Sequence, residues 1–259
     1  MAGLKFTVLQ LGFLNHPKYL VIDQEDKAEN FHSPMLAWLF EHPTLGKILY
    51  DTGNHETGAK YWGAHARETY PVSSVITIKD KLAEIGLTVD DIDILVQSHL
   101  HMDHTGGLPY FAGTKAGQSI LVNVEDAKQA FLVCRTEEDT GAYSERFICD
   151  PGIRFKTTEG ETALADDFIL FPQKCHTPGV NGIIAKTENH GNFIFVADAI
   201  YLKEGFDKNT PPGGSINKTS EEFHNHVKVI RDLQKKYAAT IIFGHDPEQY
   251  NEYLGKTID

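Results

Sequence analysis

The sequence predicts an α/β fold, because strand-like and helix-like segments alternate along its 259 residues. Residues 92–96 form an apolar run that is typical of a buried strand. Residues 221–237 instead repeat apolar side chains at helical spacing, and Ser220 is the expected N-cap of that helix. No repeat, low-complexity block or Pro/Ser-rich linker interrupts the alternation. We therefore interpret residues 1–259 as one domain.

The remaining elements follow from the same two patterns. Strands are expected at residues 5–14, 35–40, 47–50, 92–97, 119–123, 167–171, 182–186, 192–196 and 239–243. The second and third of these strands, and the seventh and eighth, are interpreted as hairpins because turn residues separate them. Helices are expected at residues 78–85, 125–134 and 221–237, the first closed by Gly86 and the second acidic at its start.

Four longer segments carry no regular pattern and are interpreted as loops, at residues 15–34, 54–71, 135–155 and 201–219. The second is rich in aromatic residues and glycine, so it could line a pocket or form a packed surface loop. The third is charged and could cover a site or be plain solvated surface. The sequence determines the conformation and the role of these four loops least.

The composition excludes several classes of partner. Lys and Arg number 24 and Asp and Glu number 36, so the formal net charge is −12, which argues against nucleic acid or an anionic membrane as the main partner. No apolar segment approaches the ~20 residues that a membrane span needs, and the N-terminus alternates like a strand rather than a signal peptide. Cys134, Cys149 and Cys175 lack C-x-x-C spacing. We expect free thiols and a cytoplasmic protein.

A dense cluster of polar side chains follows the strand at 92–97. His99, His101, Asp103 and His104 fall within six consecutive residues. Imidazole nitrogen and carboxylate oxygen are common ligands for zinc and similar divalent metals. Burying so many polar groups without a metal would leave several unsatisfied, at a cost of roughly 1–3 kcal/mol each. The cluster therefore predicts part of a metal site.

Further histidine and aspartate residues stand at the ends of other predicted strands. They are Asp51, His176, Asp198 and His245. Each alone could be a structural residue. His176, Asp198 and His245 supply the ligands that the cluster alone lacks.

The ordered motifs resemble those of the metallo-β-lactamase-fold superfamily, and most closely the N-acyl homoserine lactonases, its quorum-quenching branch. The motifs are H-x-H-x-D-H at 99–104, H-T-P-G at 176–179, Asp198 through Tyr201, and the segment from Phe243 to Gln249. The resemblance implies a four-layer αβ/βα sandwich. It also implies that His99, His101 and His176 hold one metal, that Asp103, His104 and His245 hold the other, that Asp198 bridges them, and that Asp51 orients a ligand histidine.

The same resemblance implies a hydrolase that opens a lactone ring by attack of a hydroxide bridging two metal ions. Tyr201 would donate a hydrogen bond to the developing oxyanion, and Asp103 would help to move a proton to the leaving group. Without cysteine among the ligands, the metals are expected to be zinc, with iron or manganese as alternatives. A small lactone-type molecule is the expected partner, and a homodimer is expected by analogy with relatives.

The chain departs from the lactonase pattern beside the predicted site. Val180 stands where lactonases commonly repeat a histidine, and Gln173–Cys175 replace the usual turn before His176. Neither departure removes a ligand. The substrate therefore stays open between an acyl homoserine lactone, another lactone or γ-lactam, and a thioester of the kind cleaved by glyoxalase II.

Overall fold

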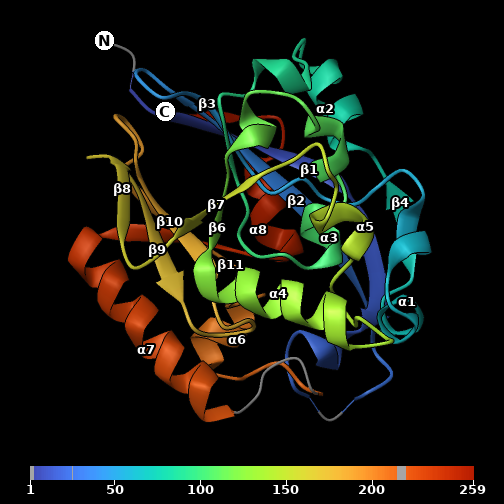
Figure 1. Ribbon diagram of the computed structural model, residues 1–259. Coiled ribbons are helices and arrows are strands. Elements are labelled where there is room, and N and C mark those ends of the chain that lie inside the picture. Colours follow the sequence, from blue (N-terminus) through green and yellow to red (C-terminus); the bar gives the residue numbers. More distant parts are fainter. Residues whose placement is uncertain (1–2, 25, 215–219) are drawn as a thin grey trace.

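The computed structural model describes residues 3–24, 26–214 and 220–259, and its strands form two sheets (Figure 1). The larger sheet has the order β13–β1–β2–β3–β5–β6–β7, and β4 pairs with β1. From β3 to β7 its neighbours are parallel, whereas β1, β2 and β3 are antiparallel. The bounds are β1 (Lys5–Pro17), β2 (Asn30–His42), β3 (Gly46–Tyr50), β4 (Val72–Val75), β5 (Ile94–Val96), β6 (Ile120–Asn123), β7 (Phe155–Thr158) and β13 (Thr257–Ile258).

The smaller sheet has the order β12–β11–β10–β9–β8. Only its pair β11 and β12 is parallel among the pairs of this sheet in the described residues. Its strands are β8 (Thr162–Ala165), β9 (Phe168–Gln173), β10 (Val180–Lys186), β11 (Asn192–Ala197) and β12 (Ala239–Phe243). The parallel crossover brings the ends of β11 and β12 to the same edge, which matters for the site described below.

Aromatic side chains pack between the two sheets. Phe6 on β1 lies 4.8 Å from Phe193 and 5.3 Å from Phe195 between ring centroids, both on β11 of the other sheet. It also lies 5.8 Å from Trp38 on β2 and 6.2 Å from Tyr253. These edge-on and tilted contacts bury large apolar surfaces from both sheets in one core.

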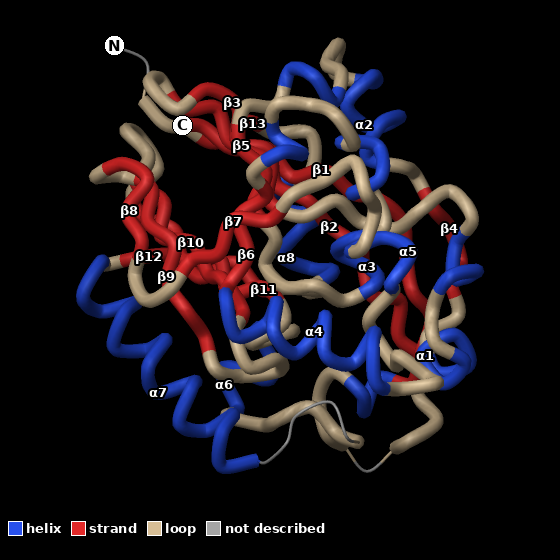
Figure 2. The backbone as a smooth tube through the Cα atoms, in the orientation of Figure 1, coloured by secondary structure: helices blue, strands red, loops and turns tan. Residues whose placement is uncertain are grey.

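Helices cover the outer faces, which gives four layers (Figure 2). On the smaller sheet, α7 buries Phe223, Val227 and Ile230, while α2 and α4 pack on the outer face of the larger sheet. None of the helices in the described part of the chain is long and apolar enough to cross a membrane. The helices are α1 (Ala64–Thr69), α2 (Ile78–Glu84), α3 (Met102–Thr105), α4 (Val124–Thr136), α5 (Glu145–Ile148), α6 (Lys203–Lys208), α7 (Ser220–Tyr237) and α8 (Pro247–Tyr253).

The predicted α/β class, both hairpins and all nine predicted strands are confirmed. The helix α2 ends as predicted. Gly86 adopts a positive φ of 76°, and the next amide, that of Leu87, donates to the carbonyl of Leu82 at 2.9 Å. This is the hydrogen bond of a Schellman C-cap, which glycine favours because it has no Cβ.

All four predicted loops are wrong in part, since residues 64–69 of the second form α1 and residues 145–148 of the third form α5. Residues 15–17 and 30–33 continue β1 and β2, because backbone pairing extends a ladder even where the side chains are polar. Residues 203–208 form α6, supported by i,i+4 pairs from Lys203 to Asp207 and from Lys208 to Glu204. The last five residues of the predicted loop 201–219 lie outside the described residues. Four short strands, β4, β7, β8 and β13, and the short helices α1, α3, α5 and α8 were not predicted.

Candidate metal centre

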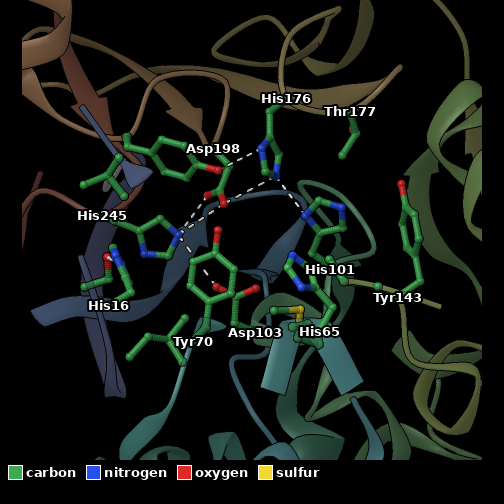
Figure 3. Close-up of a pocket in the computed structure, with 18 of the residues that line it drawn as sticks. His16, His65, Tyr70, His101, Asp103, Tyr143, His176, Thr177, Asp198 and His245 are labelled. Carbon is green, nitrogen blue, oxygen red and sulfur yellow. Dashed lines mark hydrogen bonds and ion pairs between the residues drawn. The ribbon is translucent and has the colours of Figure 1, made fainter. Parts of the chain in front are cut away.

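The predicted ligands come together where strands of both sheets end. The segment His99–His104 follows β5 of the larger sheet, whereas His176, Asp198 and His245 follow β9, β11 and β12 of the smaller one. Figure 3 shows His101, Asp103, His176, Asp198 and His245 facing one another across a small space. The side chains form two groups whose ligand atoms lie within 4.8 Å of one another, His99 with His101 and His176, and Asp103 with His104, Asp198 and His245.

In the first group three imidazoles turn a ring nitrogen toward a common point. His176 Nε2 lies 3.1 Å from His99 Nε2 and 2.8 Å from His101 Nδ1. Burial lowers the pKa of His101 to about 4 and the pKa values of His99 and His176 well below the ordinary value. The rings are therefore neutral at pH 7, which is the state in which imidazole binds a metal.

The second group contains two carboxylates, and Asp198 lies between the two groups. Burial pushes the pKa of His104 down, but the carboxylates of Asp198 and Asp103 outweigh it and raise that pKa well above the ordinary value. The pKa of His245 is raised in the same way. Asp198 Oδ1 lies 3.1 Å from His245 Nε2, and its Oδ2 lies 3.6 Å from His176 Nε2 in the first group. The two carboxylates therefore favour positively charged partners in the second group.

Two buried atoms of the second group lack a hydrogen bond. His104 Nε2 and Asp198 Oδ1 lie 3.3 Å apart, yet neither makes a hydrogen bond within the described residues. A buried polar atom left in this way costs roughly 1–3 kcal/mol. A divalent cation between them would satisfy both lone pairs, so the residues present fit a metal ion.

The outward-facing ring nitrogens are held by other groups. His245 Nδ1 donates to the carbonyl of Pro34 at 2.8 Å, so Nε2, which faces Asp198, is the ring nitrogen that would bind a metal ion. His99 Nδ1 lies 2.9 Å from Ser98 Oγ, and His176 Nδ1 lies 2.8 Å from the Tyr201 hydroxyl. Partners of this kind fix the tautomer and orientation of a metal-binding histidine.

Asp51 makes the contact that the resemblance predicts. Its Oδ2 lies 2.8 Å from His104 Nδ1, and its Oδ1 accepts from the Ser98 amide at 2.7 Å. Asp51, His176 and Ala197 all adopt positive φ, at 66°, 72° and 45°. Non-glycine residues in this region cost roughly 1–3 kcal/mol each and gather at functional sites. The strain therefore lies where strand ends turn side chains toward the centre.

Replacing Asp51 with asparagine is expected to weaken metal affinity by about 10–100-fold, because a neutral amide orients His104 less firmly and no longer balances its charge. Competition with a chromogenic chelator measures this directly. Asp166→Asn, at an exposed carboxylate, is the matched control and should keep the affinity of the parent. An Asp51→Asn protein that binds metal as tightly as this control would show that Asp51 does not position His104.

A cavity of about 310 Å³ opens beside the two groups. All four segments that the sequence left as loops contribute to its wall: His16 and Ser33 from the first, Tyr70 from the second, Tyr143 from the third and Tyr201 from the fourth. The third loop therefore covers the site. In the second loop, His55 instead stacks on Tyr110 and on the buried Phe147. Val180, which stands where lactonases commonly have a histidine, is fully buried in the core between the sheets.

The sequence reasoning missed one buried carboxyl group behind the cluster. Asp126 Oδ2 accepts from the Leu100 amide at 2.7 Å, between two predicted ligands, and its Oδ1 lies 3.4 Å from the Tyr143 hydroxyl. Burial raises the pKa of Asp126 to about 7. Its position in the first turn of α4 was interpreted only as favourable for the helix dipole, and nothing in the local sequence shows that it faces inward.

Two packed sheets with helices outside, and a buried histidine–aspartate centre at the edge that both sheets share, define a class of αβ-sandwich proteins built to hold metal ions. The sequence profile of the metallo-beta-lactamase superfamily matches residues 34–245. The chain belongs to this superfamily.

Individual relatives point to one branch of it. N-acyl homoserine lactonase AiiA from Bacillus thuringiensis subsp. kurstaki is 28% identical over 226 residues, which span 83% of this chain and 82% of the relative. N-acyl homoserine lactonase AiiB from Agrobacterium fabrum is 28% identical over 242 residues, which span 86% and 83%. A structure of a B. thuringiensis AiiA variant with N-decanoyl-L-homoserine bound at its active site superposes with a TM-score of 0.80 at 26% identity, over 97% of both chains.

Proposed function

We propose that this protein is a metal-dependent hydrolase that opens the ring of a lactone, an N-acyl homoserine lactone or a similar compound. The observation that carries the proposal is the convergence of seven ligand side chains from both sheets beside a cavity. The similarity to lactonases over more than four fifths of the chain supports the choice of substrate. Because both sheets contribute ligands and share one core, we also treat residues 1–259 as one domain.

His99, His101 and His176 would hold one ion, and Asp103, His104 and His245 the other, with Asp198 shared. The donors are nitrogen and oxygen only, a set that suits zinc and also accommodates iron or manganese. When bound, a pair of divalent ions lowers the pKa of water toward neutrality and polarises a carbonyl group. The protein's part is to fix the ligands through their outward hydrogen bonds and to enclose the substrate.

We infer that Tyr201 donates a hydrogen bond into the cavity. If His176 uses the lone pair of Nε2 as a ligand, its Nδ1 carries the hydrogen and donates to the Tyr201 oxygen 2.8 Å away. The hydroxyl hydrogen of Tyr201 is then free to donate to a substrate oxygen. Burial and the nearby Asp198 carboxylate raise the pKa of Tyr201 well above the ordinary value, so the hydroxyl stays protonated at neutral pH. This supports a role for Tyr201 in stabilising the oxyanion.

Asp103 combines two properties that a proton carrier needs. It lines the cavity, and its Oδ2 lies 3.7 Å from His104 Nε2 and 3.8 Å from His245 Nε2. A carboxylate in this position can pass a proton from the attacking water to the oxygen that leaves the ring carbonyl.

Removing the Tyr201 hydroxyl tests its role. Tyr201→Phe is expected to lower kcat for lactone hydrolysis by about a hundredfold, with a much smaller change in KM, because the hydrogen bond is stronger in the transition state than in the ground state. Tyr237→Phe, at the far end of α7, is the control. A higher KM at the kcat of the parent would instead assign Tyr201 to substrate binding alone.

The substrate class is tested by a pH-indicator screen of metal-loaded protein against homoserine lactones, other lactones, γ-lactams and thioesters. The proposal predicts acid release from lactones, fastest from acyl homoserine lactones. Acid release from thioesters alone would contradict it and favour a reaction like that of glyoxalase II.

The finer parts of the proposal need separate measurements. We infer zinc as the metal, cytoplasmic location, a homodimer and a quorum-quenching role, the last because it would follow from hydrolysis of acyl homoserine lactones. Cell fractionation, light scattering of the purified protein and the loss of signal activity from a lactone solution would each test one of these inferences.

A further inference from the structure

A buried pair of polar side chains, His16 and Ser33, forms part of the cavity wall. The ladder between β1 and β2 places Leu14 opposite Ser33, so His16, two residues further along the same face, is the diagonal neighbour of Ser33. The two residues are only 4% and 1% exposed. Both line the cavity beside the metal centre together with Leu14, Val21 and Tyr70.

The hydrogen bonds of this pair have a definite direction. His16 Nδ1 lies 2.9 Å from the carbonyl oxygen of Pro17, and a carbonyl can only accept, so Nδ1 carries a hydrogen. Burial favours the neutral form of the His16 ring, whose only N–H hydrogen is then on Nδ1, so Nε2 has a free lone pair. Ser33 Oγ lies 2.7 Å from Nε2 and must donate its only hydrogen there. Toward a substrate, Ser33 Oγ can therefore only accept a hydrogen bond.

The Ser33 oxygen lies close to the end of the cavity where the candidate metal ligands gather. The next residue, Pro34, accepts the hydrogen bond from His245, so Ser33 is one residue from the backbone that holds a predicted ligand. His16 packs against Tyr70, with ring centroids 5.3 Å apart, and both residues line the same cavity as His245. A fixed acceptor on a wall that also carries Leu14 and Val21 favours a substrate that brings a donor to this point.

We propose that Ser33, held by His16, is a specificity-determining residue that selects lactones with an amide N–H on the carbon next to the ring carbonyl. The inference rests on the proposed lactone hydrolysis and adds the group that distinguishes one lactone from another. With the ring carbonyl at the metal centre, an amide nitrogen on the neighbouring carbon is two bonds away. Its N–H reaches the adjacent wall, where Ser33 accepts it. A lactone without this donor leaves the accepting lone pair of Ser33 Oγ buried without a donor, although the hydroxyl still donates to His16.

The test compares two substrates that differ in one group. They are N-hexanoyl homoserine lactone and its analogue in which CH₂ replaces the amide N–H, with the side-chain carbonyl kept. We expect the wild-type protein to favour the amide by about tenfold or more in kcat/KM, the size of one buried hydrogen bond. Ser33→Ala should reduce this ratio to near one. His16→Phe should reduce it as well, because Ser33 can then rotate its hydroxyl and act as a donor.

The outcomes separate this inference from the proposed function. If the wild-type protein hydrolyses neither lactone, the proposed function is wrong and the inference falls with it. If it hydrolyses both and the ratio in Ser33→Ala and His16→Phe equals that of the wild type, lactone hydrolysis stands and the role of Ser33 is wrong. If the variants lose kcat/KM by the same factor on both substrates, His16 and Ser33 have a structural role only. Ser33→Cys, which keeps the size but accepts weakly, replaces Ser33→Ala if that variant does not fold.

Discussion

Asp198→Asn is expected to lower kcat/KM for lactone hydrolysis by about a thousandfold or more. Asp198 is the side chain that approaches both groups of ligands, with its oxygens 3.1 Å from His245 Nε2 and 3.6 Å from His176 Nε2. The neutral amide keeps the shape but removes the charge that two metal ions would share. Losing electrostatic stabilisation of several kcal/mol corresponds to a rate loss of this size. Steady-state hydrolysis at saturating metal measures the effect.

Asp232→Asn provides the matched control for this variant. Asp232 is an exposed carboxylate on α7, so its substitution makes the same chemical change far from the centre. It should retain hydrolysis within about twofold of the parent, as surface substitutions usually do. Hydrolysis by Asp198→Asn within tenfold of this control would mean that Asp198 does not bridge metal ions.

Phe6→Ala is expected to lower the free energy of unfolding by about 3–5 kcal/mol, the usual cost of removing a fully buried phenylalanine. Phe6 is 1% exposed and contacts aromatic rings from both sheets. The small residue would leave a cavity at the point where the sheets meet, and rigid neighbouring rings fill such a cavity poorly. Denaturant unfolding followed by tryptophan fluorescence measures the change, since Trp38 packs beside Phe6.

Leu132→Ala is the matched control for the core substitution. Leu132 on α4 is 59% exposed, so its truncation should change the free energy of unfolding by no more than about 0.5 kcal/mol. A loss below 1 kcal/mol for Phe6→Ala would show that the contact between the sheets contributes little to stability.

The sequence predicted the parts of the fold whose pattern is local. Densely apolar strands, two hairpins and the cap at Gly86 carry their signal in neighbouring residues, and all are present. Four of the candidate ligands could be named for a related reason, since H-x-H-x-D-H places four donors in one short segment. The contact between Asp51 and His104 needed the resemblance, because 53 positions separate the two residues.

The sequence did not show which residues form the wall of the cavity. Many of its residues come from the four segments without periodicity, and long-range pairing decides which of them face inward. Ser33 acquires its role only because the ladder of β1 and β2 continues past the polar residues. Asp126 looks like an ordinary acidic residue at a helix start, until the fold places Leu100 against it. Such contacts depend on tertiary packing, which local patterns do not record.

The central claim is that two metal ions bound by the histidine–aspartate centre drive lactone hydrolysis. It is tested most directly by elemental analysis of protein purified without added metal, combined with hydrolysis of N-hexanoyl homoserine lactone before and after chelation. The account predicts about two divalent ions per chain, loss of hydrolysis on chelation and its return when zinc is added back. Metal-free protein that hydrolyses the lactone at an undiminished rate would contradict it.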